Sequence, residues 1–145
     1  MKIVVNVLIK QNNKILMVKE ASGDSKGMWN FPAGHLDENE DVFNGAIREA
    51  KEETGYNVKL TGLINVQNLV MPNKHVVLFM FAGEIIDGEI SFDENEIGEV
   101  KFIEIDELLK MNNNELRSAD LRKTSIELLK QGKIYPLEII ENYKY

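Results

Sequence analysis

The first thirty residues alternate between apolar segments and polar breaks. Ile3–Ile9 and Lys14–Lys19 are rich in valine, isoleucine and leucine, and the polar residues QNNK between them are typical of a tight turn. This pattern predicts a β-hairpin. Glu20–Asn30, which contains Gly23 and Gly27, predicts a loop.

The next segment changes to a helical period. Glu40–Thr54 is predicted to be a helix, and Gly55 follows it as a favourable C-terminal cap. Further strands are expected at Tyr56–Leu60, Leu63–Val70, His75–Phe81, Glu84–Ile86, Glu89–Phe92 and Glu99–Ile105. The C-terminal part predicts two helices, Asp106–Met111 and Ser118–Gln131. Strands on both sides of a central helix predict an α/β fold in which a mixed sheet carries helices on its faces.

Composition narrows the class of protein. The 145 residues are 43% hydrophobic and 28% charged, which is ordinary for one globular domain spanning 1–145. A net charge of −7 argues against broad binding to nucleic acid or anionic membranes. The chain has no cysteine, which excludes disulfides, thiolate catalysis and zinc–thiolate sites. No apolar run is long enough to span a bilayer, so a cytoplasmic protein is expected.

Acidic residues concentrate on one face of the predicted central helix. At about 100° per residue, Glu52 and Glu53 fall at about −60° and +40° from Glu49. Arg48 stands next to Glu52 on the helix surface, where it can neutralise or orient that carboxylate. The adjoining sector, expected to face the core, contains Phe43, Ala46, Ile47, Ala50 and Thr54.

Two interpretations of this acidic face compete. The first is a solvated charged surface, which is the usual meaning of a charge run. The second is a site of clustered carboxylate oxygens suited to Mg²⁺ or Mn²⁺. A calcium-binding EF-hand is excluded, because Val42 and Arg48 stand where that loop requires glycine and glutamate.

The stretch from Gly34 to Tyr56 carries a family resemblance. It fits the pattern G-x5-E-x7-R-E-x-x-E-E-x-G through Gly34, Glu40, Arg48, Glu49, Glu52, Glu53 and Gly55. This pattern resembles the Nudix box of the MutT/Nudix hydrolases. The resemblance implies a Nudix-type α/β/α sandwich with a mixed β-sheet and a loop–helix–loop catalytic motif. One departure is Pro32-Ala33-Gly34, where the family usually has Pro-Gly-Gly.

The resemblance also implies roles for individual residues. The metal ligands would be Glu49, Glu52, Glu53 and the carbonyl of Gly34, with Mg²⁺ as the cofactor and Mn²⁺ as a possible substitute. Arg48 would orient these groups, and Glu40 would support the loop or bind metal through water.

The identity of the general base and the role of Lys19 stay open. The general base would be either Glu49 or an acid of the loop Asp93–Glu99, with Glu96 preferred to Glu94. Lys19 ends a strand where the family often places a basic residue against phosphate, and an ordinary surface lysine is the alternative.

The implied reaction is hydrolysis of a nucleoside diphosphate linked to another moiety. We expect a MutT-like (deoxy)nucleoside triphosphate pyrophosphohydrolase that acts on a nucleotide-like small molecule. Nucleotide sugars, dinucleoside polyphosphates and RNA 5′ ends remain alternative substrates, and a non-catalytic nucleotide-sensing module is the alternative function. No DNA-binding domain or membrane partner is expected, and a homodimer is conceivable.

Overall fold

The computed structural model describes residues 1–145, all in one chain. Its elements are β1 (Lys2–Gln11), β2 (Lys14–Glu20), β3 (Trp29–Asn30), β4 (Ala33–His35), α1 (Val42–Thr54), β5 (Tyr56–Met71), β6 (Lys74–Gly88), β7 (Ile97–Glu104), α2 (Ile105–Lys110), α3 (Ala119–Lys130) and the 3₁₀ helix η1 (Leu137–Ile139). None of the helices has the length and apolarity that a membrane-spanning helix requires.

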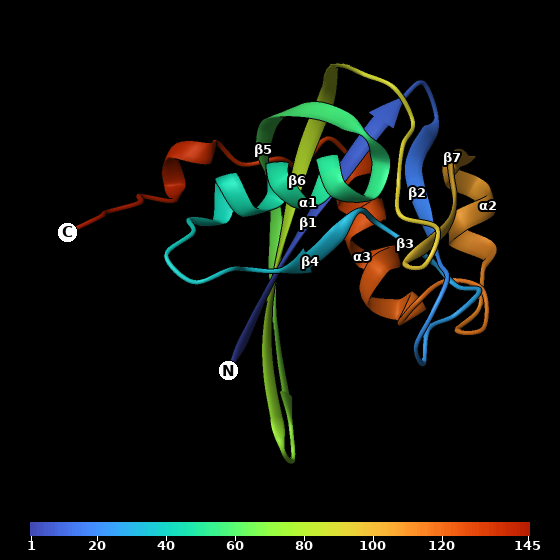
Figure 1. Cartoon of the computed structure of the whole chain (residues 1–145), viewed down its shortest axis with the longest axis horizontal. Helices are drawn as coiled ribbons and strands as arrows, with labels where there is room; N and C mark the ends of the chain where they lie inside the picture. The colour runs from blue at the N-terminus through green and yellow to red at the C-terminus, as the bar shows by residue number, and fades with distance from the viewer.

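The strands form a mixed sheet with the order β3-β2-β1-β6-β5, in which β4 also pairs with β1 and β7 with β2 (Figure 1). Strands β1 and β6 are parallel, from Lys2↔Val76 to Ile9↔Gly83, and the other pairs are antiparallel. The mixed sheet expected from the sequence is therefore confirmed.

The predicted hairpin forms, but only its tip is paired. Strands β1 and β2 share the pairs Lys10↔Ile15 and Gln11↔Lys14, around a turn in which Asn12 has φ 57°. Asparagine adopts this left-handed conformation more readily than most residues. Beyond the tip, β1 pairs with β6 and β4, whereas β2 pairs with β7 and β3. This arrangement places β4 directly beside the first half of β1.

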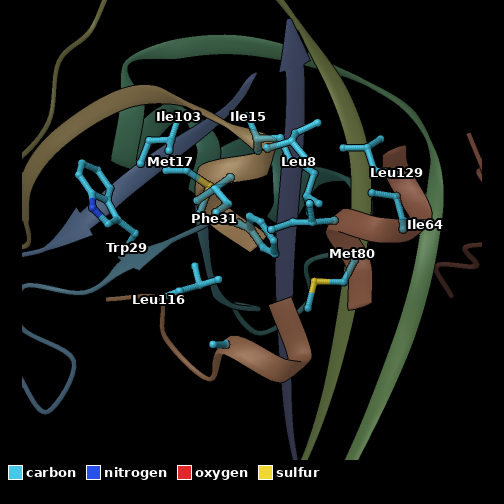
Figure 2. Packing of buried hydrophobic residues seen from close by; sticks show 14 of the residues in the cluster. Leu8, Ile15, Met17, Trp29, Phe31, Ile64, Met80, Ile103, Leu116 and Leu129 are labelled. Atoms are coloured by element: carbon cyan, nitrogen blue, oxygen red, sulfur yellow. The ribbon is translucent and has the colours of Figure 1, made fainter. Parts of the chain in front are cut away.

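Helices cover both faces of the sheet. On one face, Ala46 and Ala50 of α1 pack in a hydrophobic cluster with residues of the sheet such as Val7 and Phe81. On the opposite face, a second cluster joins the sheet to α2 and α3, and Figure 2 shows Leu8 and Met80 of the sheet pointing toward α3. Two apolar clusters on opposite faces confirm the α/β/α sandwich.

Local chemistry fixes the two ends of α1. Asp41 caps its N-terminus by accepting a hydrogen bond from Asn44 N at 2.9 Å. Gly55 ends the helix at φ 86°, a conformation that glycine tolerates. The helix begins at Val42 rather than at the predicted Glu40, so Glu40 belongs to the loop that precedes it.

The strands after α1 are longer than the sequence predicts. The two segments expected between Tyr56 and Val70 form the single strand β5, and those between His75 and Ile86 form β6. These two strands make a long hairpin whose tip extends beyond the rest of the fold (Figure 1). Gly62 coincides with one of the register shifts in β5, which is why the break was expected there.

The predicted strand Glu89–Phe92 is wrong. This segment follows Gly88, which has φ 99°, and no neighbouring strand pairs with it. Instead, Ser91 N donates to Thr54 O at 3.0 Å, a carbonyl in the last turn of α1. The segment therefore satisfies an orphan group at the helix end and does not extend the sheet.

Candidate active site

Strand β4 and helix α1 bring the central groups of the box together. Ala33 N donates to Glu53 Oε1 at 2.9 Å. At Gly34 an added β-carbon would lie 2.2 Å from Glu49 Cδ, so only glycine lets β4 pass this close to that carboxylate. Ala33 has no left-handed backbone conformation to support, and alanine is accepted there without strain. The departure from Pro-Gly-Gly thus leaves the site intact.

Arg48 connects the other acidic residues of the box. Its Nε lies 2.7 Å from Glu40 Oε2, and its Nη1 lies 2.9 Å from Glu49 Oε1 and 3.2 Å from Glu52. Its Nη2 donates to the carbonyl of His35 at 3.1 Å, which ties the loop after β4 to α1. The hydrogen bond from Arg48 lowers the pKa of Glu40. This geometry fits the orienting role expected of Arg48 and the loop-supporting role expected of Glu40.

Glu53 differs from these residues because it has no cationic partner. Its pKa is raised from 4.5 to about 8, chiefly by desolvation and also by the nearby carboxylates of Glu20, Glu49 and Glu96, and the hydrogen bond from Ala33 opposes this rise. Burial also raises the pKa of Glu49, although Arg48 partly offsets this effect. Carboxylates of low exposure that repel one another are typical of functional sites.

The donor set fits a hard divalent cation. Carboxylate oxygens and a backbone carbonyl are the ligands that Mg²⁺ and Mn²⁺ prefer. A cation bound there would relieve the repulsion around Glu53, which no positive side chain now offsets. No three acidic or histidine side chains lie in ligand geometry, and Glu49 and Glu52 both contact Arg48. Glu52 is also the more exposed of the two, at 55% against 14% for Glu49.

The loop Asp93–Glu99 contributes one of its acids to this cluster. Ala21 N donates to Glu96 O at 2.9 Å, which fastens the loop to the end of β2 and brings Glu96 close enough to raise the pKa of Glu53. Glu94 and Glu96 are both exposed, and of the two only Glu96 affects the pKa of Glu53. Of these two acids, Glu96 is therefore the one whose charge reaches Glu53.

Glu20 also belongs to this cluster, although the sequence predicts a loop at Glu20–Asn30 and no site residue there. It is the last residue of β2, at a register shift between Lys19 and Glu20 in the pairing with β7. The sequence signal for Glu20 is an acidic residue directly after an apolar strand.

Lys19 lies elsewhere. Its Nζ is 5.3 Å from the centre of the Trp29 ring, with the Lys101 Nζ 5.2 Å from the same ring. These are cation–π distances. Lys19 does not line the cavity beside Glu53, and its role in substrate binding stays a prediction.

A cavity of about 450 Å³ opens beside Glu53 and Gly34. Its walls come from β1, β4, the β5–β6 hairpin and the start of α3, and they include Arg122. Sequence reasoning missed this arginine too. A signal existed, because Arg122 has helical spacing to Ile126 and Leu129 and so shares the core-facing side of its helix.

Comparison with known proteins identifies the family. The family model described as NUDIX domain matches residues 1–123. The chain therefore belongs to the NUDIX family. The protein named Phosphatase NudJ from Shigella boydii serotype 4 (strain Sb227) is 32% identical over 145 residues, which are 99% of this chain and 92% of that protein. Phosphatase NudJ from Escherichia coli (strain K12) is 31% identical over the same shares.

Solved structures agree with this assignment. A NUDIX hydrolase from Nitrosomonas europaea superposes with a TM-score of 0.87 and 27% identity, over 98% of this chain and 97% of that one. A structure described as UDP-X diphosphatase has a TM-score of 0.75 and 25% identity, over 92% of this chain and 64% of that one. The expected family, fold and enzyme class are confirmed: the chain is a Nudix hydrolase.

Proposed function

We propose that this chain is a divalent-metal-dependent pyrophosphohydrolase of (deoxy)nucleoside triphosphates or similar phosphoanhydrides. The observation that carries the proposal is Glu53, a carboxylate with low exposure, no cationic partner and three acidic neighbours at the edge of a cavity. A solvated charged helix, the competing interpretation, gives no reason for a carboxylate to be desolvated among other carboxylates.

The residues of the site would have different roles in hydrolysis. Glu49, Glu53 and the carbonyl of Gly34 would hold Mg²⁺ or Mn²⁺, with Glu52 at the exposed side and Glu40 through water. A bound divalent cation supplies charge screening for the phosphoanhydride and makes a water molecule more nucleophilic. Arg48 keeps the carboxylates of Glu40 and Glu49 in place through its hydrogen bonds.

The proton from the attacking water needs a base beside the cluster. Glu96 is our first choice, because it lies near Glu53 on a loop fixed to β2. Glu49 is the alternative, since burial raises its pKa and makes it a better proton acceptor than an exposed glutamate.

The substrate class rests on the cavity and on the relatives. A volume of about 450 Å³ is within the range of small-molecule sites, and it favours a compact substrate. The similar protein named Phosphatase NudJ and the solved structure described as UDP-X diphosphatase keep both the release of phosphate and the cleavage of UDP-linked diphosphates under consideration. The single domain over 1–145, the cytoplasmic location and a homodimer stay predictions.

One experiment tests the proposal. Purified protein is incubated with Mg²⁺, Mn²⁺ or excess EDTA and a panel of nucleoside di- and triphosphates, nucleotide sugars, dinucleoside polyphosphates and 5′-triphosphorylated RNA. We expect hydrolysis that EDTA abolishes and Mg²⁺ restores, and the release of orthophosphate or pyrophosphate identifies the bond that is cleaved. Binding without turnover across the whole panel would instead support a nucleotide-sensing module, and full turnover in excess chelator would contradict the metal requirement.

A further inference from the structure

Arg122 is a buried cation with unused hydrogen-bond donors. It is 5% exposed, and its only hydrogen bond runs from Nε to Asn30 Oδ1 at 3.1 Å. Neither terminal nitrogen has a protein acceptor, and no carboxylate lies within ion-pair distance of the guanidinium. Both nitrogens keep access to the open space of the cavity that Arg122 shares with Glu53. The wall of the cavity thus carries a guanidinium whose two terminal nitrogens have no protein partner.

The surroundings hold Arg122 in place without neutralising it. The carboxylates of Glu20 and Asp120 favour the charged form of Arg122 without forming an ion pair with it. The Oε1 of Glu20 instead accepts from Asn30 Nδ2 at 3.3 Å and lies 3.6 Å from Arg117 Nη1. Burial lowers the pKa of Arg122 to about 10, so it remains charged at neutral pH. A buried charge is costly unless a partner of opposite sign compensates it. An anion in the cavity would be that partner.

The rest of the cavity also favours an anionic group at its inner end. Arg117 lies beside Glu20 on the same wall, and the exposed Lys2 and Lys74 line the outer part. No phenylalanine, tyrosine or tryptophan lines the cavity, so it offers no such ring on which a nucleobase could stack. The chemistry of the inner wall matches a phosphate better than a base.

We propose that Arg122, flanked by Arg117, forms a subsite for the terminal phosphate of the substrate. The enzyme would then prefer substrates that end in a free phosphate over those, such as nucleotide sugars, in which both ends of the diphosphate are esterified. A terminal phosphate presents three acceptor oxygens and more negative charge than an internal one, and the planar guanidinium can bind two oxygens at once. The choice of substrate rests on the proposed function, whereas the anion subsite itself does not.

Phosphate binding tests the subsite directly. Inorganic phosphate is titrated into wild type, Arg122→Met, Arg122→Lys and Glu127→Gln at low ionic strength, and the Kd is measured by ³¹P NMR. We expect Arg122→Met to weaken binding at least about tenfold and Arg122→Lys to weaken it less, because lysine keeps the charge but loses the paired donors. The exposed α3 residue Glu127 is the matched control and should leave the Kd within about twofold.

Folding does not confound this test. Methionine in place of Arg122 removes a buried charge with little loss of volume, so thermal melts should show a variant as stable as wild type. A wild type that binds no phosphate, or a folded Arg122→Met that binds it as tightly as wild type, would overturn the subsite.

Michaelis constants test the preference for substrates that end in a free phosphate. With Mg²⁺, Arg122→Met should raise the KM for UDP at least about tenfold and change the KM for UDP-glucose less than threefold, with smaller effects on kcat for both. Equal changes for the two substrates would overturn the terminal-phosphate preference. A wild type that hydrolyses neither compound, nor any other of the panel, would refute the proposed function, and the phosphate titration would still decide the subsite.

Discussion

Replacing Glu53 by glutamine should change how the stability of the metal-free protein depends on pH. The pKa of Glu53 is about 8 in the folded protein and 4.5 when it is free of its surroundings. Between these values the folded state binds more protons than the unfolded state. The free energy of unfolding therefore falls as pH rises, by about 1.4 kcal/mol per pH unit from this group and by about 5 kcal/mol over the full interval.

Glutamine imitates the protonated carboxyl group and does not titrate. Its side-chain oxygen can still accept from Ala33 N. We therefore expect Glu53→Gln and wild type to have similar stability near pH 5, and the variant to be several kcal/mol more stable above pH 8. His35 titrates in the opposite sense, because burial lowers its pKa, with Lys2 and Lys74 adding to the effect. Both proteins contain His35, so its contribution cancels when the free energy of unfolding of one is subtracted from that of the other.

The assay is urea unfolding in EDTA at intervals between pH 5 and 9 for wild type, Glu53→Gln and the control Glu127→Gln. Saturating Mg²⁺ should stabilise wild type above pH 7, by about 2.7 kcal/mol at one hundred times its Kd, and should stabilise Glu53→Gln much less. Parallel stability curves for wild type and Glu53→Gln across this range would refute the claim that Glu53 is desolvated among uncompensated carboxylates.

Four further variants test other parts of the account. Gly34→Ala should lower kcat by orders of magnitude and leave a folded protein, because the β-carbon of the new alanine would displace the Glu49 carboxylate. Ala33→Gly should stay active. Initial rates and thermal melts are compared for these two variants. Glu96→Gln should lower kcat at least about 100-fold with little change in Mn²⁺ affinity, and a normal kcat would transfer the role of base to Glu49. Phe43→Ala should cost about 2 kcal/mol in urea unfolding, because this ring is only partly buried.

Much of the fold follows from the sequence because its signals are local. The hairpin turn at Asn12, the helix ended by Gly55 and the apolar period of α1 each depend on neighbouring residues, and the structure confirms them. The strand predicted at Glu89–Phe92 has the right alternation but no partner strand. Pairing depends on distant parts of the chain, which one sequence does not reveal.

The candidate site likewise has features that the local sequence predicts and others that depend on distant parts of the chain. Helical geometry places Glu49 and Glu53 close together, so the acidic face was predictable. It does not predict that the Glu52 side chain is 55% exposed, or that Phe43, expected in the core, is only partly buried. Glu20 comes to the cluster through the pairing of β2, far from the box in sequence.

The central claim is that Glu53 belongs to a metal-dependent hydrolytic site and not to a charged surface. The most direct test is kcat at saturating Mg²⁺ for wild type, Glu53→Gln and the exposed control Glu127→Gln, on the best substrate of the panel. We expect Glu53→Gln to lose at least about 100-fold in kcat while remaining folded, and Glu127→Gln to match wild type. A Glu53→Gln variant with the turnover of wild type would contradict the claim.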